Sequence, residues 1–147
     1  MDVYDDNYPT CAETFATLRI FSALVSAAEI SQRIGVEASR THTLGDPVSP
    51  TTNAQRKDHA WFLSSKGHVV SRDTRRHLDW LLDQIEPSLD ELRRLRTEGA
   101  HMDIMSYWVS ASGEGGPAIS SRQMERLAPF GIDCWWDVYF DQDECAG

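Results

Sequence analysis

The fold of this chain is decided by residues 120–141, which read SSRQMERLAPFGIDCWWDVYFD. Ser120 stands three residues before Gln123, and Gly131 closes the apolar periodicity that follows, so this unit carries the start and stop signals of a helix. From residue 132 onward apolar and polar side chains alternate, which predicts a strand with one face in the core. A capped helix that leads directly into an amphipathic strand indicates a mixed α and β architecture.

The same pattern occurs elsewhere in the chain. Serine, a glutamate three residues later and a closing glycine predict helices over residues 26–35 and 88–99. A further helix starts at a cap on Asp73, because apolar residues follow at helical spacing up to Ile85. Alternating side chains predict further strands at residues 14–24, 59–64 and 101–110, a small hairpin through 66–70, and a long polar loop over 37–58.

The order of these elements predicts an α+β fold in a single domain. We expect a mainly antiparallel sheet of about four or five strands with the helices packed on one face, of ferredoxin-like type. A chain of 147 residues suits one domain with one core. The predicted organisation is an acidic N-terminal tail over residues 1–13, the domain over 14–140 and a C-terminal tail over 141–147.

The charge of the chain restricts its partners. Fourteen lysines and arginines oppose 23 aspartates and glutamates, which gives a formal net charge of −9. Such a surface repels nucleic acids and anionic membranes and attracts basic proteins. Three cysteines without a C-x-x-C pair, and the lack of a signal peptide or an apolar span, indicate a soluble cytoplasmic protein with reduced thiols.

Several segments occur in a recognisable order. They are Leu44-Gly-Asp46, Trp61-Phe-Leu-Ser-Ser65, His77-Leu-Asp-Trp-Leu-Leu82, Met124-Glu-Arg-Leu-Ala128 and Asp137-Val-Tyr139. With them, the chain resembles domain of unknown function 4279, a family of small bacterial proteins, over residues 16–140. The resemblance implies a single α+β domain and carries over no activity, cofactor or catalytic residue.

The leading hypothesis is a non-enzymatic interaction module. The second face of the predicted sheet collects aromatic and charged side chains of the kinds enriched at interfaces. The candidate surface comprises Arg19, Asp103, Tyr107, Trp135, Asp137 and Tyr139. We expect this face and the acidic ends of the chain to bind a basic protein, for example as the neutralising partner of a basic effector, or to form a homodimer.

The alternative is a small ligand-binding protein or hydrolase. Its pocket would lie between the loop over residues 37–58 and the region of Trp61 and His77, with candidate residues Asp46, Trp61, Ser64 and His77. Ser64 or Ser65 could act as a nucleophile with His77 as its base, oriented by Asp73 or Asp79. No cofactor or metal site is predicted, because the five histidines lack ligand spacing.

Overall fold

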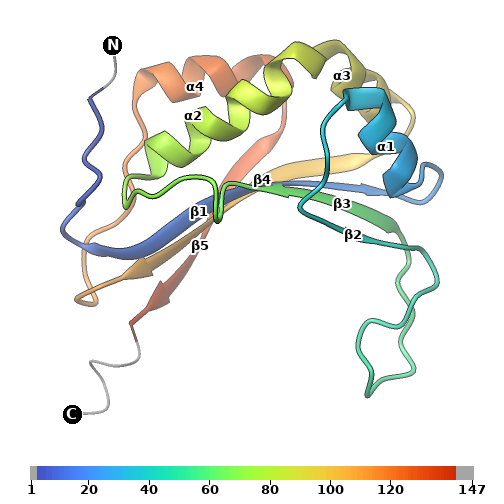
Figure 1. The fold of residues 1–147 in the computed structure, drawn as a ribbon, viewed down its shortest axis with the longest axis horizontal. Helices are drawn as coiled ribbons and strands as arrows, with labels where there is room; N and C mark the ends of the chain where they lie inside the picture. The colour runs from blue at the N-terminus through green and yellow to red at the C-terminus, as the bar shows by residue number, and fades with distance from the viewer. Residues whose placement is uncertain (1–2, 142–147) are drawn as a thin grey trace.

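The computed structural model describes residues 3–141, in which one five-stranded sheet carries the helices on one face (Figure 1). The strands are β1 (Cys11–Ser22), β2 (Arg40–His42), β3 (His59–Ser64), β4 (His101–Ser110) and β5 (Asp133–Phe140). The helices are α1 (Ala27–Ile34), α2 (Thr74–Ile85), α3 (Leu89–Thr97) and α4 (Ser121–Leu127), with 3₁₀ turns η1 (Glu86–Ser88) and η2 (Ala128–Phe130). The predicted α+β class and the placement of the helices on one face are confirmed.

The strand order is β2-β3-β1-β4-β5, so β1 lies at the centre and β5 at one edge. β1 pairs antiparallel with β3 and β4, and β2 pairs antiparallel with β3. β4 and β5 are parallel neighbours joined by the crossover through α4. In a ferredoxin-like fold, another strand lies between the two parallel strands that a helix connects. Here β4 and β5 are direct neighbours, so the ferredoxin-like type is not confirmed.

Local capping sets where most of the helices begin. The Ser26 hydroxyl accepts the N–H of Glu29 at 3.2 Å, and α1 ends at Gly35 with a left-handed φ of 70°. Asp73 caps α2 by accepting the N–H of Arg75 at 3.0 Å. Ser120 and Gln123 form the predicted capping box at α4.

Ser88 does not act as the predicted helix cap. Its hydroxyl donates instead to the carbonyl of Ile34 at 2.7 Å, which fixes the start of α3 to the end of α1. The chain passes from α2 through η1 into α3, and the N–H of Leu89 already bonds to the carbonyl of Glu86. The backbone of η1 therefore supplies an acceptor at the start of α3. The Ser88 hydroxyl is not needed as a cap there and bridges α3 and α1 instead.

Three other sequence predictions need correction. The hairpin expected at residues 66–70 is a turn, in which the N–H groups of His68 and Val69 both bond to the carbonyl of Ser65. From there the chain leads to the start of α2 and is held by the N–H of Arg72, which bonds to the carbonyl of Asp6. The predicted loop over residues 37–58 contains β2, and the first strand begins at Cys11, earlier than expected.

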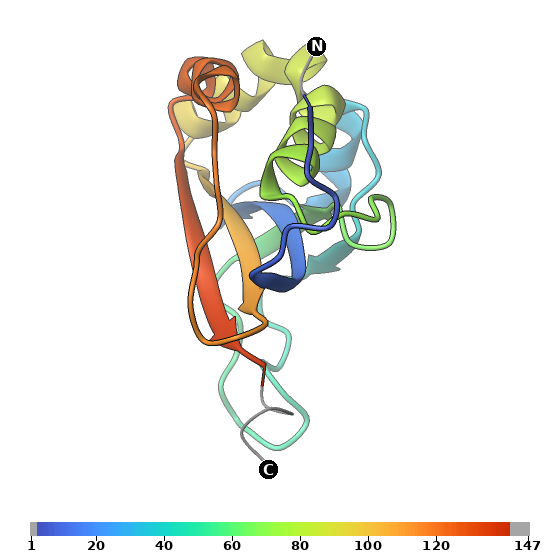
Figure 2. The ribbon, with the colours of Figure 1, turned by 90° about the vertical axis from the view of Figure 1, so that its left-hand side faces the viewer.

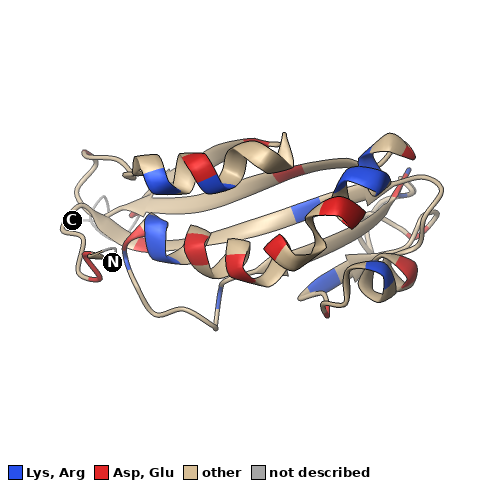
Figure 3. Ribbon diagram, turned by 90° about the horizontal axis from the view of Figure 1, so that it is seen from above, with Lys and Arg blue, Asp and Glu red and all other residues tan. Residues whose placement is uncertain are grey.

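The core lies between the sheet and the helices. Leu18 and Ile104 are paired across the central strands, and both are fully buried beneath α2 residues such as Leu78 and Leu81. Burying each such side chain contributes about 1.5–3 kcal/mol. Seen from above, the helix layer carries basic and acidic residues interspersed along its outer surface (Figure 3). Over residues 3–141, the helical side therefore carries no large patch of only positive or only negative charge.

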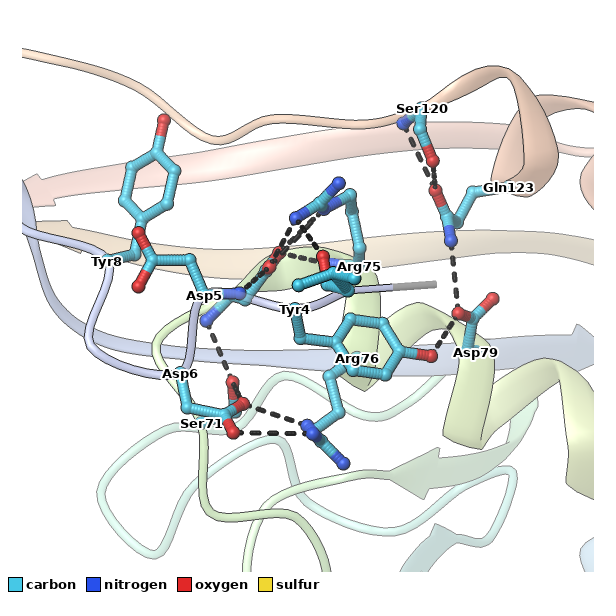
Figure 4. A network of polar contacts seen from close by, with 12 residues as sticks. Tyr4, Asp5, Asp6, Tyr8, Ser71, Arg75, Arg76, Asp79, Ser120 and Gln123 are labelled. Atoms are coloured by element: carbon cyan, nitrogen blue, oxygen red, sulfur yellow. Dashed lines mark hydrogen bonds and ion pairs between the residues drawn. The ribbon is translucent and has the colours of Figure 1, made fainter. Parts of the chain in front are cut away.

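Residues that precede β1 bind the start of α2 (Figure 4). The N–H of Asp5 donates to the Asp73 carboxylate at 2.8 Å, and the Tyr4 hydroxyl donates to Asp79. Asp6 accepts from Ser71 at 2.6 Å and from Arg76 at 2.8 Å. The acidic residues of this segment therefore join it to the helix layer of the domain.

Candidate functional site

The second face of the sheet is open over the described residues, and no helix lies on it (Figures 1 and 2). The loop between β2 and β3 extends from this side, below the strands in both views. Odd-numbered residues of β4 and β5, and of β1 from Glu13 onward, point to the open face, because side chains alternate along a strand. All six residues of the predicted interaction surface stand on it, namely Arg19, Asp103, Tyr107, Trp135, Asp137 and Tyr139.

Arg19, Asp103 and Trp135 form a fixed polar cluster on this face. The guanidinium of Arg19 donates two hydrogen bonds of 2.7 Å to the two carboxylate oxygens of Asp103. The indole Nε1 of Trp135 donates to Asp103 at 3.1 Å, and the Arg19 guanidinium lies 5.2 Å from the Trp135 ring centre. Burial opposes ionisation of Asp103, but the bonds from Arg19 and Trp135 outweigh it and lower its pKa.

An aromatic row continues the cluster toward the edge of the sheet. Tyr107 stacks on Phe15 with ring centres 4.8 Å apart and contacts Tyr139 at 5.2 Å. The Tyr139 hydroxyl donates to Asp137 at 2.8 Å, and this bond raises the pKa of the phenol. The predicted residues therefore form two neighbouring clusters.

The large aromatic side chains that are exposed on this face lie along the edge strand β5. Trp135 is 39% exposed and Tyr139 is 47% exposed, whereas such large aromatic side chains are usually well covered. We use the name β5 margin for the accessible side chains of this strand, which are Asp133, Trp135, Asp137, Val138, Tyr139 and Phe140. Val138 and Phe140, expected on the core face, are 49% and 55% exposed because the strand extends beyond the helix layer.

The alternative pocket is not assembled as predicted. His77 is bonded to Ser65, not Ser64: its Nδ1 lies 2.6 Å from the Ser65 hydroxyl, and its Nε2 lies 2.8 Å from the Ser71 carbonyl. A carbonyl can only accept, so Nε2 carries the proton and Nδ1 accepts from Ser65. The Ser65 oxygen accepts in turn from the N–H of Ala16 at 2.9 Å. This chain of bonds joins α2 to the central strand.

Burial keeps this pair out of contact with a substrate. Ser65 is 0% exposed and His77 is 1% exposed. Burial lowers the pKa of His77, which therefore stays neutral at physiological pH. His77 borders a surface hollow of about 550 Å³ near Phe15, but both of its ring nitrogens are already bonded. The arrangement supports packing between helix and sheet better than nucleophilic catalysis.

The other predicted pocket residues lie apart from His77. Trp61 is fully buried under α1, where its Nε1 donates to the Ser31 hydroxyl at 2.9 Å. Ser64 is on the open face, and its hydroxyl accepts the N–H of Lys66 at 3.1 Å. Asp46 is exposed in the loop after β2, where its carbonyl accepts the N–H of Arg56 at 2.8 Å. Among residues 3–141, no hydrogen bond or ring contact joins these three residues to His77.

The model of the family described as Domain of unknown function (DUF4279) matches residues 12–141. The chain belongs to this family. The match runs from β1 to the end of β5, so the open face and the His77 network both lie within the family domain. The resemblance read from the sequence is thereby confirmed. Neither the curated proteins nor the solved structures include a match to this chain.

Within residues 3–141, no three histidine, cysteine, aspartate or glutamate side chains gather so that they could hold a metal ion. Burial raises the pKa of the Cys11 and Cys134 thiols to about 11, so both stay protonated and weakly nucleophilic. None of the described helices is both long and apolar enough to span a bilayer.

Sequence reasoning missed the half of the open face that β2 and β3 form. Phe62 of β3 points to this face, and Arg40 and His42 of β2 lie against its ring. The alternation over residues 59–64 contained the signal for Phe62. β2 has only three residues and lies inside a turn-rich segment. Its pairing with β3 is a tertiary contact, which a local sequence pattern does not predict.

Proposed function

We propose that this protein is a non-enzymatic interaction module that binds a basic protein through the β5 margin. The observation that carries the proposal is the exposure of Trp135 and Tyr139 beside Asp133 and Asp137 on an edge strand. Tryptophan and tyrosine are enriched at protein interfaces and in their energetic hot spots. Neighbouring carboxylates add a preference for a partner of opposite charge.

The geometry of β5 gives a partner two ways to bind. β5 is last in the strand order and pairs with β4 on one side, with no further strand on its other side among residues 3–141. A partner segment can extend the sheet there by strand addition, or it can cover the open face beside the edge. Trp135 is held by Asp103, so little side-chain entropy is lost when a partner covers it.

Charge supports a basic partner. The net charge of −9 accelerates association with a protein of opposite sign, and the effect weakens as salt is added. Neutralisation of a basic bacterial effector is the specific role that we propose for such a module. We further propose a cytoplasmic location, because Cys11 and Cys134 are free thiols and such thiols persist in reducing compartments.

The test is salt-dependent capture by the immobilised protein. We expect it to retain a basic protein from native lysate at low salt, and the retained protein, once identified and purified, to bind with a Kd that rises with salt. The variant Trp135→Ala/Tyr139→Ala should bind this protein at least about tenfold more weakly, as hot-spot residues do. The matched control is Leu24→Ala/Val70→Ala, which removes two side chains that are 82% and 95% exposed elsewhere.

Two results would contradict the proposal. The first is the absence of any basic protein from the low-salt eluate. The second is a captured protein that binds the Trp135→Ala/Tyr139→Ala variant and the control with equal affinity. Sedimentation of the free protein over a range of concentrations tests for a homodimer. If the mass doubles at high concentration, and Trp135→Ala/Tyr139→Ala stays a monomer, the partner is a second copy of the chain.

A further inference from the structure

A second binding feature lies on the other half of the open face. A hollow of about 640 Å³ runs between the central strand β1, the neighbouring strands β3 and β2, and the loop that follows β2. Small-molecule sites commonly enclose about 300–1,000 Å³, so this hollow is large enough for a metabolite. Phe15, Phe21 and Phe62 contribute aromatic rings to its lining.

The charges around this hollow are opposite in sign to the charge of the protein. Arg19, Arg40, Arg56 and Lys66 all line it, and none of its described lining residues is an aspartate or glutamate. Asp103 neutralises Arg19, but no ion pair to a carboxylate from Arg40, Arg56 or Lys66 occurs within residues 3–141. A chain of net charge −9 therefore concentrates uncompensated positive charge at one concave site.

The cations lie close to the aromatic rings. The Arg40 guanidinium is 4.7 Å from the centre of the Phe62 ring, and the Lys66 ammonium is 5.3 Å from that of Phe15. Both cations are exposed, so the rings orient them without burying them. A ligand that covered the hollow would exclude water from these cations and so strengthen its own ionic contacts with them.

His42 of β2 also lines this hollow, close to the same cations. Its ring meets the Phe62 ring edge-on, with the ring centres 5.3 Å apart. Burial lowers its pKa, and the charges of Arg56 and Arg40 lower it further against the opposing effect of Asp46. The two arginines thus disfavour one more positive charge at this position, as expected of a site with a positive potential.

We propose that this hollow binds a small organic anion that carries an aromatic ring. The ring would lie against the phenylalanines, and its phosphate or carboxylate would be held by Arg40 and Arg56, whose planar guanidinium groups suit both kinds of oxyanion. This site goes beyond the proposed function, because it lies on the opposite half of the face and selects the opposite charge. A small anion fits better than a polyanion, since the remaining acidic surface repels extended nucleic acid.

The experiment uses 8-anilinonaphthalene-1-sulfonate, a fluorescent aryl anion, as the probe on the full chain. We expect saturable one-to-one binding that is reversed by adenosine monophosphate or by benzoate. At the same concentrations, adenosine, which lacks the charge, and inorganic phosphate, which lacks the ring, should displace little. Displacement by the nucleotide identifies a phosphate ligand, and displacement by benzoate identifies a carboxylate.

Matched variants locate the site. Arg40→Gln/Arg56→Gln should raise the Kd of the probe at least about tenfold, because each lost guanidinium removes a charge-assisted bond. Arg93→Gln/Arg94→Gln makes the same change in net charge on helix α3, on the other side of the sheet, and should leave the Kd unchanged. Both variants alter exposed or partly exposed side chains, and equal melting temperatures establish that both are folded.

Several results would overturn the proposal. They are the absence of saturable probe binding, equal binding by the two arginine variants, displacement by adenosine as strong as by adenosine monophosphate, and tighter binding of an oligothymidylate than of the mononucleotide. The variant Trp135→Ala/Tyr139→Ala should keep full probe binding. A protein that fails to capture a basic partner can therefore still pass this test, and the two proposals fail separately.

Discussion

His77 shows how one side chain connects two layers of the fold. It accepts from Ser65 at the end of β3 and donates to the carbonyl of Ser71 before α2. The sequence identified this histidine as a group between helix and sheet but left a catalytic role open. The structure favours the packing role, because the ring is 1% exposed and both of its nitrogens are bonded.

The pH dependence of stability tests this role. Well above pH 6.5, His77→Gln should lower the free energy of unfolding by about 1–3 kcal/mol, because two buried groups lose a matched partner. The folded-state pKa lies below 6.5, so the unfolded chain binds a proton first as the pH falls. The wild type then loses stability below pH 6.5 that the variant does not lose, and the difference between them shrinks.

Urea denaturation of both proteins, at a series of pH values on either side of 6.5, measures this difference. A difference that stays constant or grows on acidification would show that His77 is not held neutral by the fold. The comparison with the variant removes the contributions of the other four histidines, which both proteins share.

Sequence reasoning at the residue scale was best where a contact is local. Ser26, Asp73 and Ser120 cap helices as predicted, since each signal and its target are two or three residues apart. Ser88 carries the same signal and forms a tertiary bond instead. His77 bonds to Ser65 and not to Ser64 because Ser65 lies on the side of the sheet that faces the helices. Which side faces the helices is known only once the sheet is assembled.

At the scale of elements, the start of α2 holds the chain that precedes β1. The Asp73 carboxylate is 1% exposed and accepts from the N–H groups of Asp5 and Arg75. It is also paired with the Arg75 guanidinium at 2.8 Å. One side chain thus caps a helix and fixes a segment 68 residues away in the sequence.

Removing that carboxylate should affect both elements. Asp73→Ala is expected to lower the free energy of unfolding by about 1–3 kcal/mol, through the lost cap and the unpaired N–H of Asp5. Amide hydrogen exchange of residues 5–10 should accelerate in the same variant. Ser26→Ala is the control, because it removes the cap of α1 at a cost of about 0.5–2 kcal/mol and holds no distant segment.

Hydrogen exchange of residues 5–10 in the two variants tests whether Asp73 holds this segment. Unchanged protection of residues 5–10 in Asp73→Ala would mean that the bonds of Asp6 to Ser71 and Arg76 hold the segment without Asp73. Faster exchange in Ser26→Ala as well would indicate a general loss of stability and contradict a local role.

The elements themselves could be predicted because each has a strong internal period. Residues 101–110 and 59–64 coincide with the bounds of β4 and β3. β2 was missed since three residues carry no period, and the hairpin at residues 66–70 was wrong because a Lys-Gly turn does not specify where the chain goes next. The parallel pairing of β4 with β5 follows from the crossover through α4, not from the pattern of either strand.

For the whole molecule, one continuous core predicts one unfolding transition. Ile104 is 0% exposed on β4, which contacts the central strand and the edge strand alike. Ile104→Ala should lower the free energy of unfolding by about 2–5 kcal/mol, because the deletion leaves a cavity. The same midpoint should be seen by far-ultraviolet circular dichroism and by tryptophan fluorescence.

The matched control is Val70→Ala, whose side chain is 95% exposed and should change stability by less than about 0.5 kcal/mol. Two separated midpoints for Ile104→Ala would mean that the β5 margin unfolds apart from the remaining sheet. That result would argue against a rigid binding face.

The whole-molecule charge was the least informative prediction about the site. A net value of −9 indicates a basic partner, yet the open face is divided into the β5 margin, with its aspartates, and a hollow lined by cations. The net charge sums over both regions and so hides the difference between them. To tell them apart one needs the strand order, which places β2 and β5 at opposite edges of one sheet.

The attachment of residues 3–10 to the helical layer has a practical consequence for surface-based assays. The chain leaves this layer next to α2 and α4, whereas the candidate ligand sites look out from the reverse side of the strands (Figure 1). A tether fused ahead of Val3 would therefore orient the molecule with its helices toward the support. Both candidate surfaces would then project into the solution, accessible to analytes as large as another protein.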